Sequence, residues 1–267
     1  MNDVPLGTGL GRIAPIILAV ALGLGGCDDD FLSPDQEVAR EDFSFDVEVT
    51  TQTRLQLNAI NGTITITGAS NSDSIFITGV REVRSETRED AEANLENLQV
   101  DVDVQETVIR VTTIQPEDPD GRTYVVDYEI TVPADLLEVI RNANGNVTLQ
   151  SIDADVDVTN ANGNIILSNI AGSAMVDLGN GQVDGRVTLP ANGTIDIAVG
   201  NGGIELSIPQ STSAQFAASV GNGAVTVSNL TLEDMVASTQ SVVGRLGSGD
   251  GEIVLTVGNG AITVVGF

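Results

Sequence analysis

Apolar residues keep a fixed register around a recurring Asn-Gly pair. Counted from the Asn, they usually stand six and four positions before it, and three and five positions after it. Around Asn162 they are Val156, Val158, Ile165 and Leu167. Such alternation predicts strands with one buried face, so each pair marks a corner between two short strands. The corner pairs are Asn61 and Gly62, Asn144 and Gly145, Asn162 and Gly163, Asn180 and Gly181, Asn201 and Gly202, Asn222 and Gly223, and Asn259 and Gly260.

The spacing of the corners favours a stack of coils. Successive corners from Asn144 to Asn222 are 18, 18, 21 and 21 residues apart, which suits one coil of a β-solenoid. Gly suits a corner that needs positive φ, and Asn side chains at equivalent corners can hydrogen-bond in a ladder. The sequence therefore predicts an all-β, parallel β-helix or β-solenoid-like stack. Asn-Gly is also the strongest signal for a two-residue hairpin, so stacked hairpins remain the alternative.

Two regions follow a leader and a tether. Residues 43–135 are predicted to form an irregular β region with one short helix over residues 85–98. A hairpin near Glu106 is expected, and the residues predicted to face each other are Val100, Val102 and Val104 on one strand and Val108, Arg110 and Thr112 on the next. Residues 136–267 are predicted to form the repeat region, and residues 43–267 one continuous domain. The rule places Glu138 inside the stack, which predicts a bulge or a domain junction there.

The first residues of the chain predict that the protein is located in the bacterial cell envelope. Residues 13–26 are apolar and small, about the length of a signal-peptide core and too short for a membrane span. They end in Leu24-Gly25-Gly26 before Cys27, which looks like a lipobox. Residues 1–26 are therefore predicted to be a lipoprotein signal peptide, with lipidation at Cys27 and a membrane anchor there. A plain secretion signal with an incidental cysteine is the alternative. Residues 27–42 are predicted to be an acidic, flexible tether.

Composition narrows the possible chemistry. The formal net charge is −27, and the chain has no His and no Trp. Such a chain repels nucleic acid, because phosphate binding needs clustered Lys or Arg. Cys27 is the only cysteine, so no disulfide can form within the chain. Without His, Lys or a free thiol, the usual nucleophile and base sets are missing, and only carboxylates remain.

Three acidic clusters were candidate sites. Asp153, Asp155 and Asp157 alternate and would share one face, where they could hold a metal or a sugar. Asp101 and Asp103 form a similar pair. The favoured interpretation of both is the solvated face of a strand. Residues 247–251 (Gly-Ser-Gly-Asp-Gly) are similar to calcium-binding repeats, but they occur once and their Asp is out of register. No metal, cofactor or catalytic residue is predicted.

The order of the motifs resembles the bacterial β-strand-repeat, adhesin-like family. The resemblance is carried by Ile130-Thr131-Val132-Pro133, by Asn142-Ala143-Asn144-Gly145-Asn146, by Asn160-Ala161-Asn162-Gly163-Asn164, and by Val199-Gly200-Asn201-Gly202 with Ile208-Pro209. It covers roughly residues 45–267. It implies an extracytoplasmic, right-handed β-helix-like fold, and it brings no catalytic residues with it.

Three functions follow as hypotheses. The leading one is a non-enzymatic, adhesin-like envelope lipoprotein whose rigid solenoid contacts glycan or envelope protein. The second is a glycan-active β-helix hydrolase or lyase, which needs two converging carboxylates. The third is a structural or envelope-stress accessory protein. Low aromatic content, 3% of the residues, argues against strong sugar stacking.

Overall fold

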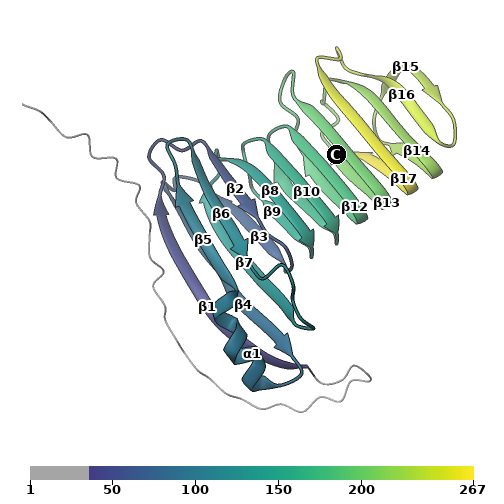
Figure 1. Ribbon diagram of the computed structural model, residues 1–267. Coiled ribbons are helices and arrows are strands. Elements are labelled where there is room, and N and C mark those ends of the chain that lie inside the picture. Colours follow the sequence, from purple (N-terminus) through teal and green to yellow (C-terminus); the bar gives the residue numbers. More distant parts are fainter. Residues whose placement is uncertain (1–35) are drawn as a thin grey trace, which may run out of the picture.

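The computed structural model describes residues 36–267 (Figure 1). The predicted signal peptide, Cys27 and the first part of the predicted tether lie outside the described residues. Within the described range, no helix is long and apolar enough to cross a membrane. Residues 37–42, predicted to belong to the tether, instead form the start of a strand. That strand is held in place because it pairs with a second strand over its whole length and buries Ala39.

The fold is all-β, as predicted, and its 17 strands form one strongly curled, mixed sheet. In chain order the elements are β1 (Glu37–Glu48), β2 (Arg54–Asn58), β3 (Ile64–Ala69), β4 (Ser74–Ser85), α1 (Arg88–Asn94), the 3-10 helix η1 (Leu95–Asn97), β5 (Gln99–Val104), β6 (Val108–Ile114), β7 (Thr123–Pro133), β8 (Leu137–Asn144), β9 (Val147–Gln150), β10 (Val156–Asn162), β11 (Ile165–Ile170), β12 (Ala174–Val187), β13 (Thr194–Ile208), β14 (Ala214–Ser228), β15 (Leu232–Ala237), β16 (Ser241–Leu246) and β17 (Gly251–Gly266).

Each Asn-Gly corner joins two arms that pair with different neighbours. We call the strand or half-strand before the corner the leading arm and the one after it the trailing arm. Leading arm β10 pairs in parallel with β8 and β12, and trailing arm β11 pairs in parallel with β9 and β12. The corner Asn residues stay in register, so that Asn162 stands beside Asn144 and Asn180. At this corner, each arm therefore pairs in parallel with the equivalent arms of the coils one repeat before and one repeat after it.

The order of the coils in space differs from their order in the chain. The coil of β2 and β3 pairs with that of β8 and β9, although the segment between them contains β4 to β7. At the other end, β17 lies between β13 and β14 and pairs in parallel with both. The spatial order of corners is therefore Asn61, Asn144, Asn162, Asn180, Asn201, Asn259 and Asn222. The last strand of the chain fills an internal position of the array.

The inward positions of the arms form columns of aliphatic side chains. One column runs through Ile64, Val147, Ile165, Val183, Ile204 and Ile262, each at most 1% exposed. Parallel register places equivalent side chains directly above one another, so burial continues from coil to coil. One isolated coil buries too little apolar surface to fold, and stacking supplies the rest.

The two ends of the array are closed in different ways (Figure 1). At the N-terminal end, β4 pairs antiparallel with both β1 and β7, and α1 packs on β1 and β4. At the C-terminal end, β16 pairs antiparallel with the leading arm of β14 only, over Ala214–Ser219, and β15 pairs with β16. α1 and β15 consequently lie at opposite ends of the molecule.

The short helix is present, but it begins later than predicted. Ser85 still belongs to β4, and the Thr87 hydroxyl accepts a hydrogen bond from the Asp90 N–H, which caps α1. Arg122 binds Asp90 through both carboxylate oxygens, at 2.6 and 2.8 Å. This contact ties the loop before β7 to the helix.

The predicted facing pairs of the β5–β6 hairpin are wrong by one residue. Val104 pairs with Ile109 and Val102 with Val111. The Gln105 N–H donates to the Val108 carbonyl, so only two residues form the loop. The predicted pairs require three loop residues. Because the loop has only two, the register shifts by one residue, and the valines of β5 stand opposite the alternate residues of β6.

No bulge or break is found at Glu138. β8 pairs continuously with β2 and with β10, and Glu138 stands beside Leu55 and Val156. Its side chain is fully buried in the stack. The pairing of β8 with two neighbouring strands therefore stabilises this register by more than the burial of one carboxyl group destabilises it.

Candidate functional site

The corner Asn side chains form an unbroken ladder along the array. In each step the side-chain amide N–H of one Asn donates to the side-chain oxygen of the previous one, at 2.8 to 2.9 Å. The series runs through Asn61, Asn144, Asn162, Asn180, Asn201, Asn259 and Asn222. Asn61 donates in turn to the Tyr124 carbonyl at 3.0 Å, which closes one end of the ladder. The ladder uses these amides internally, so its main role is structural.

The glycine after each Asn has a backbone that other residues rarely adopt. The φ angles of the corner glycines Gly62, Gly145, Gly163, Gly181, Gly202, Gly223 and Gly260 lie between +127° and +147°. At Gly163 an added Cβ would also stand 2.1 Å from the Gly145 carbonyl oxygen. These positions therefore need Gly for two independent reasons, the dihedral angle and the close approach of the next coil.

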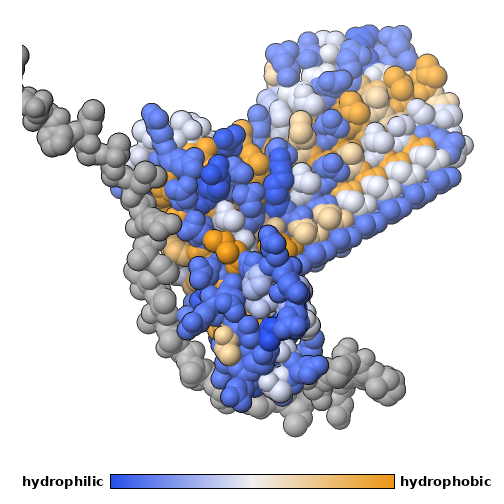
Figure 2. All heavy atoms as spheres, in the orientation of Figure 1, coloured by the Kyte–Doolittle hydropathy of each residue, from blue (hydrophilic) through white to orange (hydrophobic). Residues whose placement is uncertain are grey.

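The outer surface of the trailing arms is a broad face with two straight rows of side chains. We call this surface, extended over β7 and β4, the polar face. Its first row is Thr78, Glu129, Thr65, Thr148, Ile166, Asp184, Glu205, Thr263 and Thr226, and its second row is Phe76, Thr131, Thr67, Gln150, Ser168, Arg186, Ser207, Val265 and Ser228. Ten of these eighteen side chains carry a hydroxyl and four are charged, so the face offers mainly neutral hydrogen-bonding groups. Figure 2 shows that residues of similar hydropathy form straight rows along the array.

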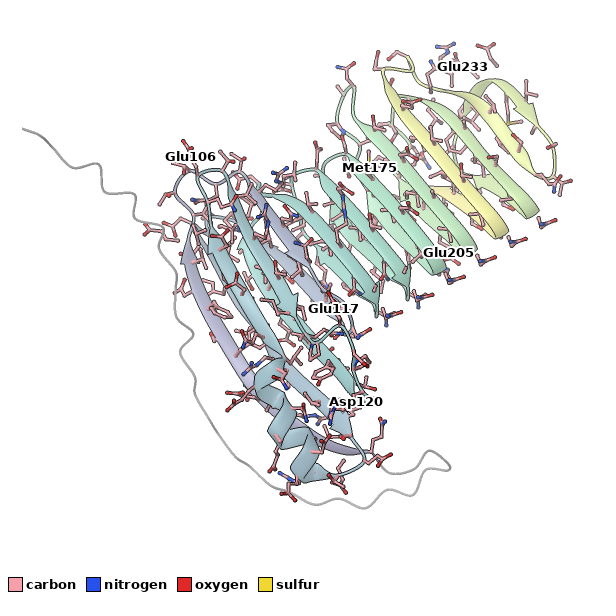
Figure 3. The ribbon with its side chains drawn as sticks, in the orientation of Figure 1. Glu106, Glu117, Asp120, Met175, Glu205 and Glu233 are labelled. Carbon is pink, nitrogen blue, oxygen red and sulfur yellow. The ribbon has the colours of Figure 1, made fainter. Side chains whose placement is uncertain are left out.

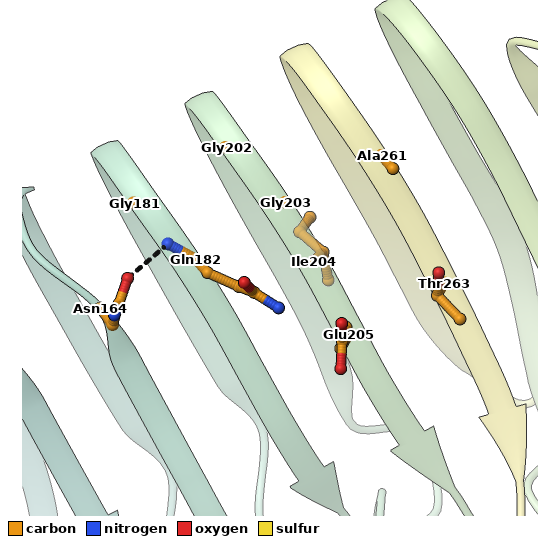
Figure 4. Close-up of a pocket in the computed structure, with 9 residues that line it drawn as sticks. All are labelled: Asn164, Gly181, Gln182, Gly202, Gly203, Ile204, Glu205, Ala261 and Thr263. Carbon is orange, nitrogen blue, oxygen red and sulfur yellow. Dashed lines mark hydrogen bonds between the residues drawn. The ribbon is translucent and has the colours of Figure 1, made fainter.

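The polar face is hollowed where the side chains next to the corner become small. The position two residues after the corner Asn is occupied by Asn146, Asn164 and Gln182 in three successive coils. In the next two coils the same position is occupied by Gly203 and Ala261. The result is a shallow depression of about 410 Å³, lined also by Glu205 and Thr263 (Figure 4). At its rim the Asn164 side-chain oxygen accepts a hydrogen bond from the Gln182 backbone N–H at 3.0 Å. The depression offers amide, hydroxyl and carboxylate groups to a ligand.

The predicted cluster of Asp153, Asp155 and Asp157 does not form a site. Asp157 receives two hydrogen bonds from Arg141, at 3.0 and 2.7 Å. Asp155 accepts the Ser173 N–H at 2.7 Å, and Asp153 precedes the strand. Two of the three carboxylates thus serve in structural contacts.

The other acidic candidates are also used locally. Asp101 and Asp103 lie on β5, and the Asp103 carboxylate accepts a hydrogen bond from Gln105 at 2.8 Å. In the turn of residues 247–251, the Asp250 carboxylate accepts hydrogen bonds from the Ser248 and Ser213 hydroxyls, which lower its pKa. Among residues 36–267, no group of three or more acidic side chains could hold a metal ion.

Exposed acidic side chains are spread over the molecule. Figure 3 places Glu106, Glu117 and Asp120 in the N-terminal region, whereas Glu205 and Glu233 belong to the array. Asp184 and Glu205 are the two carboxylates that stand beside each other on the polar face. This neighbouring pair is the arrangement on which the enzyme hypothesis has to rest.

The sequence pattern missed one notable side chain. Phe76 lies on the polar face with 46% of its surface exposed, beside a second depression. The alternation of buried Ile75 and Ile77 around it already indicated an outward ring. Its neighbours could not be read from the sequence, because they come from β7 and β3.

Comparisons with known proteins give low similarity. No family model matches the sequence, and no curated protein matches it. A solved protein from Clostridium sporogenes, provisionally named a cell adhesion protein, is 14% identical, with 86% of this chain and all of that chain covered and a TM-score of 0.49. A provisionally named adhesin from Bacteroides fragilis is 13% identical over 88% and 100%, with a TM-score of 0.34. A provisionally named lipid-binding protein from Parabacteroides distasonis is 12% identical over 84% and 96%, with a TM-score of 0.30. At these values, function has to be inferred from the chain's own residues.

Proposed function

We propose that this chain is a non-enzymatic, adhesin-like protein of the bacterial cell envelope, anchored through lipid at Cys27. In this proposal the coils form a right-handed β-solenoid, because crossovers between parallel strands of one sheet are nearly always right-handed. The solenoid holds the polar face rigid and presents it outward for contacts with envelope glycan or protein.

The polar face is the observation that carries the proposal. Its hydroxyl and amide side chains repeat in register across the trailing arms, and its depressions are shallow. A flat surface of this kind offers many weak contacts to an extended partner, and such contacts gain strength by multivalency. A catalytic site would instead need acids that converge on one bond.

The charge of the chain limits the classes of partner that it can bind. A formal net charge of −27 repels anionic polymers. Neutral glycans, and proteins with basic or uncharged surfaces, are therefore the favoured partners. Nucleic acid is disfavoured for the same reason.

The test is retention of the purified full chain on cell-wall polysaccharide, combined with an assay for released sugars. We expect the chain to sediment with the polysaccharide while no soluble sugar appears. The matched variant is Glu205→Gln, which removes a carboxylate of the Asp184 and Glu205 pair but keeps a hydrogen-bonding side chain of the same shape. Because it alters one of many weak contacts, retention should persist, and no sugar should be released. Release of sugar that is lost in Glu205→Gln would establish the enzyme instead. Capture of a membrane protein without any polysaccharide would favour the accessory role.

A further inference from the structure

Phe76 is the one exposed ring among the described residues that nothing covers. The other rings at positions 36–267 are buried at Phe43, Phe45, Phe216, Tyr124 and Tyr128. Phe267 is exposed, but the Arg186 guanidinium lies 3.4 Å from its ring centre. Phe76 takes part in none of the ring or guanidinium stacking found in this range. An exposed phenyl ring offers an apolar surface on which a ligand can pack.

Hydroxyl groups surround this ring in register. Phe76 on β4 stands opposite Thr131 on β7, and Thr131 stands beside Thr67 on β3. These side chains line a depression of about 310 Å³, together with Thr65, Thr78 and Glu129. One flat patch thus combines a ring, several hydroxyls and a carboxylate.

Most of these polar groups are available to a ligand. The Thr78 hydroxyl donates to the Glu129 backbone carbonyl at 3.0 Å, which leaves the Glu129 carboxylate unused by that contact. Glu129 and Thr78 are exposed, whereas Thr65 and Thr67 are half-buried. Half-buried hydroxyls on a rigid strand lose little freedom when they bind, so their hydrogen bonds favour binding.

We infer that this patch, the Phe76 patch, binds a pyranose unit of an uncharged polysaccharide. A pyranose ring has a face of C–H groups that packs on an aromatic ring, and its hydroxyls both donate and accept hydrogen bonds. The Glu129 carboxylate accepts from sugar hydroxyls, and together with the negative chain it disfavours anionic polymers. The inference rests on the proposed function and names its substrate class and its anchor.

The rows beyond the patch give the polysaccharide a path. Thr65 is followed by Thr148 and Thr67 by Gln150 in the next coil. Successive sugar units can therefore meet further hydroxyl and amide groups along the polar face. The ring supplies one strong contact, and the rows supply weaker ones.

The experiment is calorimetric titration of the full chain with two soluble probes, a hexamer of β-1,4-linked glucose and a hexamer of β-1,4-linked N-acetylglucosamine. We expect at least one probe to bind. Phe76→Ala should weaken this binding at least tenfold, because it removes the ring and leaves the core intact. The matched control is Met175→Ala, which removes an exposed apolar side chain from the leading arm of β12, outside the polar face. We expect it to change the affinity less than twofold.

A second variant provides a direct signal. The chain contains two Tyr and no Trp, so Phe76→Trp introduces a single Trp into the patch, and its fluorescence can be excited separately from that of Tyr. We expect this variant to keep its affinity and its emission to shift when the probe is added. Binding that Phe76→Ala leaves unchanged overturns the patch but not the proposed function. Absence of binding to both probes also overturns the patch, while retention on cell-wall polysaccharide decides the proposed function separately.

Discussion

Glu138 is the residue at which the fold accepts its clearest local cost. Both of its carboxylate oxygens are buried without a hydrogen-bond partner within the described chain. Burial raises the pKa of this carboxyl group well above its ordinary range. Its neighbours in the two adjacent strands are Leu55 and Val156, which offer no compensating charge. The group is therefore expected to be protonated in the folded chain over a wider pH range than in the unfolded chain.

This difference predicts a pH-dependent stability. Since the folded pKa is raised, the folded chain holds the extra proton between the ordinary pKa and the folded pKa. Stability is highest below the ordinary pKa and falls as pH rises towards the folded value. Glu138→Leu should remove this loss and raise the free energy of unfolding at neutral pH by about 1–3 kcal/mol. Urea denaturation of wild type and variant from pH 4 to pH 8 measures the difference, which should grow with pH.

The control for this prediction is Glu252→Leu, which alters an exposed carboxylate on β17. It should change stability by no more than about 0.5 kcal/mol, with no trend in pH. A constant difference between wild type and Glu138→Leu across the pH range would show that the carboxyl group is not desolvated.

At the same scale, the sequence placed some residues correctly and others not. The apolar register predicted the buried positions and also put Glu138 inside, but the cost of burying an acid favoured a bulge. The hydrogen-bonded ladders on both sides of β8 outweigh this cost, because they fix the register of every residue in the strand. The outward position of Phe76 was not predicted, although buried Ile75 and Ile77 alternate with it. The hydroxyls around it depend on strand neighbours far away in the chain, which no local pattern contains.

Among the elements, the Asn ladder connects all coils outside the core. Asn180 donates to Asn162 and accepts from Asn201, both at 2.9 Å. Asn222, at the end of the ladder, only donates to Asn259, at 2.8 Å. Asn180→Ala therefore removes two hydrogen bonds, and Asn222→Ala removes one.

The ladder predicts an order of effects. At about 0.5–1.5 kcal/mol for each hydrogen bond, the loss of two should lower the free energy of unfolding of Asn180→Ala by about 1–3 kcal/mol. Asn222→Ala, the matched control at an equivalent corner, should cost about half as much. Denaturation in guanidinium chloride followed by circular dichroism measures both. Equal losses would mean that the side chains act singly at their own corners and not as a ladder.

Elements were easier to predict than their boundaries. Short strands around Asn-Gly corners, and the possibility of a ladder, followed from the repeat itself. The loop of the β5–β6 hairpin was misjudged because Val108, Ile109 and Val111 are all apolar, and either register gives one strand a plausible face. The sequence predicts a tether at the start of β1 because Glu37, Arg40, Glu41 and Asp42 are polar. In the fold, these charges sit opposite β4, where Arg40 pairs with Glu82 at 2.5 Å.

For the whole molecule, the position of β17 could not be predicted from the pattern. Every coil obeys the same apolar rule, so the register of any arm fits that of any other arm. Asn222 matches Asn201 as well as it matches Asn259. The chain order would place β14 beside β13, yet β17 separates them. Directly after β17, the Phe267 N–H donates to the Ile208 carbonyl at 3.0 Å, which fixes the end of the strand further.

The position of β17 predicts how the array responds when this strand is removed. In arrays of stacked repeats each unit depends on its immediate neighbours. Without residues 251–267, β14 keeps only its pairing with β16 over Ala214–Ser219, whereas β12 and β13 keep each other. We expect hydrogen exchange to show loss of protection over residues 214–246, with residues 137–187 still protected.

The matched control keeps the strand and removes only its terminal contact. Phe267→Ala deletes the ring under Arg186 and should leave the protection of β14 as it is in the wild type. If the shortened chain instead retains protection in β14, that strand has closed onto β13, with Asn222 beside Asn201. The coils would then be able to exchange positions in the array, as their shared apolar pattern allows. The order of the array would depend on the presence of β17 and not on a preference of β14 for one neighbour.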